Sequence, residues 1–203
     1  YQNGVIKVLP KPEPYLRVFP VGIADDGTVG AWQQKNGIIR AVGWFGGEFR
    51  VLDAGGLSSI VEGVDAAGTM YGTVARADGS GMTAVTWKDG AMSAVPELGA
   101  FPSARIQKVT RNGTVAGWVY DPSIDRARVF TLFGGKLTLM APDSLGSNDI
   151  HVRDVNDQGT VLAQHGYGGT DHDFLYKNGQ SWFLRDLLGT SNEYLPSFAT
   201  ALN

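Results

Sequence analysis

The densest cluster of polar side chains in the sequence is HGYGGTDHD, at residues 165–173. It holds His165 and His172, two of the three histidines, together with Asp171 and Asp173. Imidazole and carboxylate groups bind zinc or calcium and transfer protons, so these residues would support a metal site or an acid–base pair. The histidines stand seven residues apart across glycines and match no metal-binding spacing. We therefore expect a solvent-exposed loop here, without a metal ion or cofactor.

A second oxygen-rich segment is DPSIDR, at residues 121–126. Asp121, Ser123 and Asp125 offer the hard oxygen ligands that calcium prefers. The segment lacks the spacing and the glycine of an EF-hand loop, and Asp-Pro-Ser commonly starts a turn. The sequence therefore favours a turn. Because the chain also lacks cysteine and any G-x-S-x-G motif, it shows no catalytic signature, and we expect a protein that is not an enzyme.

Aromatic side chains offer a different chemistry. Trp32 and Trp118 each stand five residues after the glycine of a recurring phrase, and Tyr71, Tyr120 and Tyr167 stand on the same segments or just after them. An exposed Trp or Tyr has an apolar face that stacks on a sugar ring and a polar group that bonds its rim. These five residues are the predicted ligand-binding set. Packing between repeats is the alternative, and for Trp32 and Trp118 the sequence alone favours it.

The elements that must position these side chains come from a repeat. The phrase DDGTV at 25–29 returns as DAAGTM at 65–70, RNGTV at 111–115 and NDQGTV at 156–161, with the glycines spaced by 41, 45 and 46 residues. Apolar residues flank each phrase, and its Asp, Asn and Gly residues suit a tight turn. Each phrase therefore predicts a β-hairpin, in a period typical of propeller blades and other repeat arrays.

A second hairpin follows each first one. Gly-Gly, Asp-Gly or Asn-Gly stands between apolar runs at residues 44–52, 87–95, 132–140 and 176–184. These dipeptides are strong signals for a two-residue hairpin turn. Each repeat thus supplies four short strands, which is the content of one propeller blade. Trp44, Trp87 and Tyr176 recur in register beside this turn, so we expect them in the core.

Half a repeat stands at each end of the sequence. Residues 1–9, YQNGVIKVL, match the second hairpin, and residues 198–203, FATALN, match the start of the first. Together they would form a composite blade, which predicts an all-β, five-bladed propeller in a single domain. An open array of β repeats is the alternative. The predicted boundaries are a half repeat with linker at 1–20, full repeats at 21–56, 57–102, 103–147 and 148–190, and the start of a fifth at 191–203.

Composition narrows the classes of partner. The net charge is -3 and only 18% of residues are charged, so neither nucleic acid nor an anionic membrane is an expected partner. The sequence has no apolar stretch of about 18 residues, and we expect no membrane insertion. Because the first residue is Tyr1 rather than Met, we expect a processed protein or an excised fragment of a longer protein.

Residues 172–203 resemble the bacterial extracellular repeat called the HAF family. That pattern runs from an aromatic FLW or FLY through a glycine and a D-L pair to a Ser-Ala segment and an I-N turn. The matching positions are Phe174, Leu175, Tyr176, Gly179, Asp186, Leu187, Ala201 and Asn203. The resemblance implies an extracellular or cell-surface location and a bacterial origin, so the chain would belong to a longer surface protein. It carries no catalytic motif and so implies no active site.

Two classes of function fit this architecture. The first is a non-catalytic ligand-binding or adhesion module that recognises a carbohydrate or another protein through the aromatic residues, since repeated shallow sites suit multivalent binding. The second is a polysaccharide-acting enzyme with its site in the propeller channel, an expectation that rests on fold analogy alone. A structural spacer domain is a third alternative.

Overall fold

The computed structural model describes residues 8–10, 17–52, 54–140, 149–167, 170–188 and 201–202. Within these residues, the strands are β1 (Arg17–Ile23), β2 (Val29–Lys35), β3 (Ile38–Phe45), β4 (Glu48–Val51), β5 (Ser59–Val64), β6 (Met70–Ala75), β7 (Met82–Lys88), β8 (Ala91–Ala94), β9 (Ala104–Val109), β10 (Val115–Asp121), β11 (Arg126–Phe133), β12 (Lys136–Leu139), β13 (Asp149–Val155), β14 (Val161–Tyr167), β15 (Thr170–Lys177) and β16 (Gln180–Phe183). The described residues also include two short helices, the 3-10 helix η1 (Pro96–Leu98) and α1 (Leu184–Leu188).

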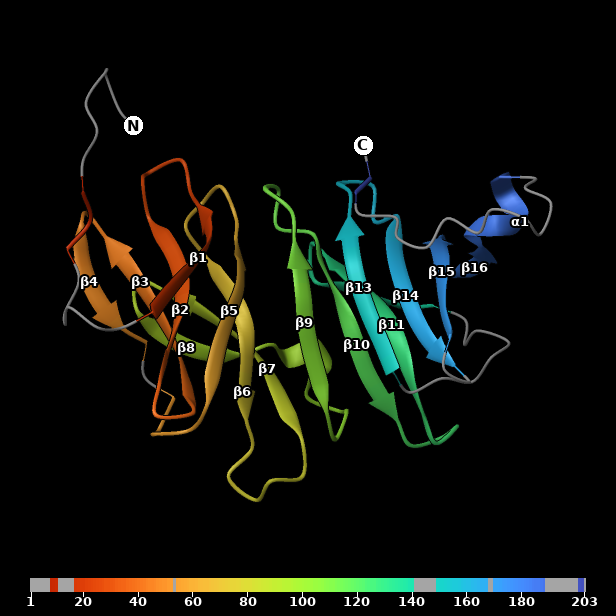
Figure 1. Ribbon diagram of the computed structural model, residues 1–203, viewed down its shortest axis with the longest axis horizontal. Coiled ribbons are helices and arrows are strands. Elements are labelled where there is room, and N and C mark those ends of the chain that lie inside the picture. Colours follow the sequence, from red (N-terminus) through yellow and green to blue (C-terminus); the bar gives the residue numbers. More distant parts are fainter. Residues whose placement is uncertain are drawn as a thin grey trace.

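These strands form four antiparallel sheets of four strands, each paired in chain order from its first strand to its fourth. The sheets stand side by side in chain order, and the first strands β1, β5, β9 and β13 contact one another in succession (Figure 1). The predicted all-β class with repeated four-stranded units is therefore confirmed. The first sheet begins at Arg17, before the predicted boundary at residue 21. Most of the two segments expected to form a composite blade lie outside the described residues.

The recurring phrase forms the same turn in all four sheets, as predicted. Its glycine adopts a positive φ of 74–84° at Gly159, Gly68, Gly113 and Gly27, a conformation that other residues rarely adopt. The threonine that follows donates its backbone N–H to a nearby Asp or Asn side chain, in the pairs Thr28–Asp26 (2.8 Å), Thr69–Asp65 (2.9 Å), Thr114–Asn112 (3.0 Å) and Thr160–Asn156 (2.9 Å). Local hydrogen bonding thus specifies these turns.

The second hairpin turn is also confirmed. Both of its central residues have positive φ in every sheet, at positions 46–47, 89–90, 134–135 and 178–179. This is the geometry of a type I′ turn, whose twist matches that of the flanking strands. Gly-Gly, Asp-Gly and Asn-Gly occupy these positions because they tolerate the left-handed region.

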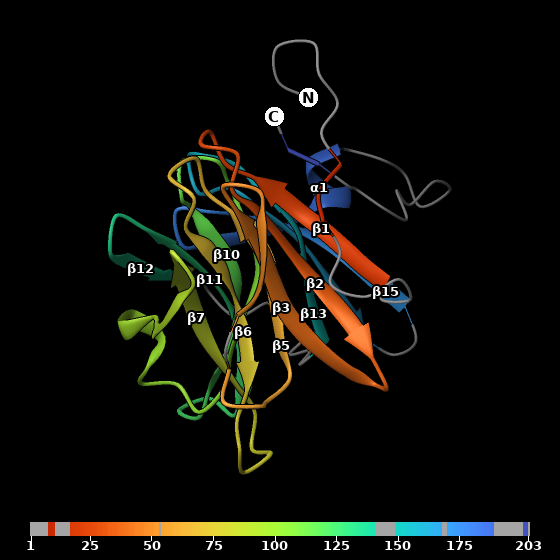
Figure 2. The same ribbon diagram turned by 90° about the vertical axis from the view of Figure 1, so that its left-hand side faces the viewer.

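The turns at one end of the sheets converge. The Asp25 N–H of the first sheet donates to the Ala66 carbonyl of the second at 3.2 Å, and the Ala66 N–H donates to the Arg111 carbonyl of the third at 2.8 Å. The Arg111 guanidinium also forms an ion pair with the Asp25 carboxylate, across the turn of the second sheet. The first three sheets therefore diverge from a common region at this end, as Figure 2 shows from the side.

Each first strand carries a β-bulge six residues before the repeated glycine. The residues omitted from the pairing register are Val21, Glu62, Gln107 and Arg153. Bulges redirect side chains, and two of these reach the next sheet. The Glu62 carboxylate pairs with Arg105 at 3.4 Å, and Gln107 Oε1 accepts the Val152 N–H at 2.9 Å. The bulges thus join neighbouring sheets.

The core lies between adjacent sheets rather than in one central cluster. Trp87 is fully buried between the first and second sheets, and Tyr176 is 1% exposed between the third and fourth. Trp44 is buried on the other face of the first sheet, where its indole N–H donates to the Pro10 carbonyl at 2.9 Å. The prediction that these three aromatic residues belong to the core is confirmed.

Candidate functional site

Trp118 and Tyr120 share one face of β10, because side chains two residues apart on a strand point the same way. Both are partly exposed, and they line a pocket of about 400 Å³ together with Ser80, Pro102 and Ser103. The structure thus brings two members of the predicted ligand-binding set into one cavity, at the end of the third sheet where Tyr120 pairs with Ala127.

The loops around this pocket are tied together by hydrogen bonds to Ser103. Its carbonyl accepts the Tyr120 N–H at 2.8 Å, and its Oγ accepts the Met82 N–H at 3.1 Å. The β6–β7 loop approaches so closely that a Cβ on Gly81 would lie 2.8 Å from both Cβ and Oγ of Ser103. A glycine at this position therefore lets the loop that carries Ser80 close one wall of the pocket.

The polar groups of the pocket suit a hydroxylated ligand. The Tyr120 hydroxyl donates to the Asp125 carboxylate, and this bond raises the pKa of Tyr120 above its ordinary value. No described residue accepts a hydrogen bond from the Trp118 indole N–H, which leaves a donor beside the aromatic face. Apolar stacking surface and rim donors therefore occur together.

The other predicted aromatic residues lie elsewhere. Trp32 occupies the same repeat position as Trp118, but its ring stacks on Phe19, with centroids 4.0 Å apart and an interplanar angle of 19°. Tyr71 packs against the core between the second and third sheets, where burial and the neighbouring Asp65 raise its pKa to about 12. The side chain of Tyr167 lies outside the described residues.

The polar cluster at 165–173 does not form the solvent-exposed loop that we expected. His165 belongs to β14 and is 1% exposed, and it pairs across the strands with His172 of β15. His165 Nε2 lies 2.8 Å from the Tyr176 hydroxyl, and the His165 ring lies 4.8 Å from that of Phe174. The expectation was wrong for His165 because the strands continue through the cluster and face the third sheet.

The remaining members of that cluster form no described metal centre. Asp173 is half-buried, and the side chain of Asp171 lies outside the described residues. In the described part of the chain, no three His, Asp or Glu side chains come together in a way that could hold a metal ion.

The DPSIDR segment forms the predicted turn between β10 and β11. Asp121 Oδ1 accepts hydrogen bonds from the Ser123 N–H and Oγ at 3.0 and 2.6 Å, and Asp121 Oδ2 pairs with Arg128 at 3.0 Å. These bonds hold the pKa of Asp121 below its usual value. Because both carboxylate oxygens are engaged within the protein, a calcium site would have to displace them.

Sequence reasoning missed the two serines and the proline of the Trp118 pocket. Ser80, Pro102 and Ser103 belong to turns whose composition is ordinary for loops. Their role depends on the approach of the β6–β7 loop to the start of β9, which involves two different repeats. No local sequence signal reports such an approach.

A comparison of the chain with models of known protein families found no match, and a comparison with curated proteins found none either. The similarity to HAF repeats therefore rests only on the residues that suggested it. Within the described residues, no helix has the length and apolar character needed to span a membrane.

Proposed function

We propose that this chain is a non-catalytic carbohydrate-binding module, and that its binding site is the pocket lined by Trp118 and Tyr120. The observation that carries the proposal is the placement of both aromatic side chains in one cavity with the serine hydroxyls of Ser80 and Ser103. The resemblance to HAF repeats supports a place in a bacterial surface or secreted protein, where such a module would serve in adhesion.

The size and chemistry of the pocket support a saccharide ligand. Its volume of about 400 Å³ lies within the roughly 300–1,000 Å³ range of small-molecule sites. A sugar presents an apolar face of C–H groups and a rim of hydroxyls, which match an indole face and nearby O–H and N–H groups. The Ser103 Oγ and the Trp118 Nε1 stand beside that face as hydrogen-bonding groups.

We further propose that the four sheets are blades of a five-bladed propeller with a composite fifth blade. The convergence of Asp25 and Arg111 supports sheets arranged around an axis. Leu9 packs on the first sheet. In the repeat it corresponds to Leu52, Val95 and Met140, each of which belongs to a hydrophobic cluster between two neighbouring sheets. The Leu202 N–H donates to Asp154 Oδ2 at 2.6 Å, beside the first strand of the fourth sheet.

The bulge positions of the first strands do not supply the acids of a glycoside hydrolase. A polysaccharide-acting enzyme of the usual kind needs two carboxylates on either side of the scissile bond. The four equivalent bulge positions of the described sheets hold a single acid, Glu62, beside a valine, a glutamine and an arginine. Glu62 is itself paired with Arg105. The enzyme alternative therefore has no pair of acids at these positions.

The test is a glycan array probed with the wild-type chain, Trp118→Ala and Trp32→Ala. Truncating a central aromatic anchor costs about 2 kcal/mol or more, so we expect Trp118→Ala to lose at least about 30-fold in affinity. Trp32→Ala is the matched control, since it removes the same residue type at the same repeat position, where Phe19 covers the ring. Circular dichroism verifies that both variants are folded.

Two outcomes would contradict the proposal. Binding that survives Trp118→Ala but not Trp32→Ala would place the site elsewhere. Absence of binding to every glycan on the array would remove the carbohydrate function and favour the spacer or protein-adhesion alternative.

A further inference from the structure

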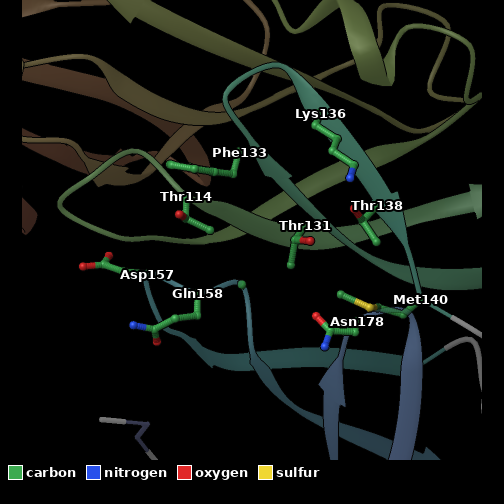
Figure 3. A pocket seen from close by; sticks show the side chains of 10 residues that line it. Thr114, Thr131, Phe133, Lys136, Thr138, Met140, Asp157, Gln158 and Asn178 are labelled. Atoms are coloured by element: carbon green, nitrogen blue, oxygen red, sulfur yellow. The ribbon is translucent and has the colours of Figure 1, made fainter.

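A groove of about 300 Å³ lies between the third and fourth sheets (Figure 3). It lies at the end of the third sheet where Thr131 pairs with Thr138 and Phe133 pairs with Lys136. The Trp118 pocket lies at the opposite end of this sheet, where Tyr120 pairs with Ala127. The two cavities share no lining residue, so the groove is a separate site.

The strands bring four polar side chains together in this groove. Thr131 and Thr138 face each other across β11 and β12, and Lys136 stands two residues before Thr138 on the same side of β12. Asn178 reaches the groove from the β15–β16 turn of the fourth sheet. Figure 3 shows the Lys136 amine directed toward Thr138, with Thr131 nearby and Asn178 beyond it, next to Met140.

These four groups are not used to hold the protein together. Among the described residues, none forms a hydrogen bond or ion pair with the Lys136 ammonium, the Thr131 and Thr138 hydroxyls or the Asn178 amide. Thr131 is only 7% exposed, but its hydroxyl is not cut off from solvent. The four groups are therefore available to form hydrogen bonds with a ligand that enters the groove.

The charges of the groove select the class of ligand. Lys136 contributes one positive charge, and Asp157, which also lines the groove, contributes one negative charge (Figure 3). Figure 3 shows the Asp157 carboxylate directed away from the Lys136 amine, so the positive charge of Lys136 remains available to a ligand. One positive charge is matched by a singly charged anion better than by the double charge of a phosphate. The hydroxyl and amide groups suit a ligand with hydroxyls next to that charge, and Met140 adds an apolar surface.

We propose that this groove binds an acidic sugar, with its carboxylate on Lys136 and its hydroxyls on Thr131, Thr138 and Asn178. The volume fits one sugar residue, since it lies at the lower limit of roughly 300 Å³ for small-molecule sites. The site does not depend on the function of the Trp118 pocket. The acidic sugar is either a free sugar acid or a uronic acid residue of a polysaccharide.

The test is a titration of the uniformly ¹⁵N-labelled chain, followed by amide chemical shifts. D-glucuronate is the probe, D-glucose the uncharged analogue and acetate the carboxylate without hydroxyls. We expect glucuronate to shift the amides of Thr131, Thr138 and Gly159, and to bind at least about 10-fold more tightly than glucose, which lacks the charge-assisted hydrogen bond to Lys136. It should also bind more tightly than acetate, which lacks the hydroxyls that contact Thr131, Thr138 and Asn178. A trimer of galacturonate, compared with monomeric galacturonate, distinguishes the two sources, since tighter binding of the trimer identifies a polysaccharide and equal binding a free sugar acid.

Two variants define the site. Lys136→Met keeps the length of the side chain without its charge, and we expect a loss of at least about 10-fold in affinity for glucuronate. Thr138→Val keeps the shape without the hydroxyl and should weaken binding less. Lys35→Met, at an exposed lysine of the first sheet, is the control and should bind as the wild type does. The amide spectra themselves report whether each variant is folded.

The proposal is overturned if glucose or acetate binds as tightly as glucuronate, or if Lys136→Met binds as well as Lys35→Met. Salt provides an independent measurement, because the Debye length falls to about 3 Å at 1 M ionic strength. Affinity for glucuronate that is insensitive to salt up to this concentration would also contradict a contact between the carboxylate and Lys136.

Discussion

Replacing Gly72 with alanine tests the packing between the first two strands of the second sheet. A Cβ at Gly72 would lie 1.9 Å from the Ile60 carbonyl oxygen and 2.9 Å from Cζ3 of Trp87. The carbonyl oxygen is backbone and cannot rotate away, and the Trp87 side chain is fully buried. The strand or the core must therefore shift to accept a single methyl group.

The expected cost follows from these contacts. Overpacking a core by a methyl group costs typically about 1–3 kcal/mol, and the backbone obstruction places Gly72→Ala at the upper end. Alanine gains roughly 0.5–1 kcal/mol over glycine in a strand, because the unfolded chain loses less freedom on folding. The net destabilisation is therefore about 2 kcal/mol.

The assay is urea unfolding followed by circular dichroism. With a slope of about 2 kcal/mol per molar urea, 2 kcal/mol lowers the midpoint by about 1 M. The control is Ala163→Gly, at the same repeat position of the fourth sheet, where an alanine already fits with 0% exposure. Ala163→Gly should lower the free energy of unfolding by about 0.5–1 kcal/mol through the greater backbone freedom of glycine, and further by the burial energy of one methyl group. A Gly72→Ala midpoint within about 0.2 M of the wild-type value would refute the reasoning.

Two further predictions concern ionisable groups. Burial raises the pKa of Glu62 above its ordinary value. Ionisation of Glu62 therefore destabilises the fold as the pH rises through the folded-state pKa, and the stability of Glu62→Gln relative to the wild type should increase from about pH 4 to about pH 7. If the urea midpoints of the two proteins differ by the same amount at about pH 4 and at about pH 7, the prediction is contradicted. Asp65→Asn should lower the pKa of Tyr71 from about 12, although burial keeps it above its ordinary value; an unchanged alkaline absorbance titration would show that the Asp65 charge has no effect.

The candidate site was predictable only in part. Trp118 and Tyr120 were identified from their residue types and their repeat position, and the structure places both in one pocket. Trp32 was identified by the same reasoning, yet its cross-strand neighbour is Phe19, whereas that of Trp118 is Arg105. Whether a ring is covered thus depends on the partner across the sheet, which the repeat position does not specify.

The burial of His165 was also not predictable from the local sequence. Its glycine-rich surroundings predicted an exposed loop, but its burial comes from the facing third sheet and from Phe174 and Tyr176 on the next strand. Glycine and aspartate near a position raise the probability of a turn without determining where the turn begins.

The sequence by itself determined the all-β class, the four-strand repeat and the two kinds of hairpin turn. Those features are local, because residues such as Gly27 and Asn178 adopt the required positive φ through their own chemistry, whatever surrounds them. Only the tertiary structure decided which aromatic rings are covered, that His165 is buried, and that Lys136 and Asn178 line one groove from two different sheets. These outcomes depend on contacts between residues far apart in the chain, and a repeat pattern does not specify such contacts.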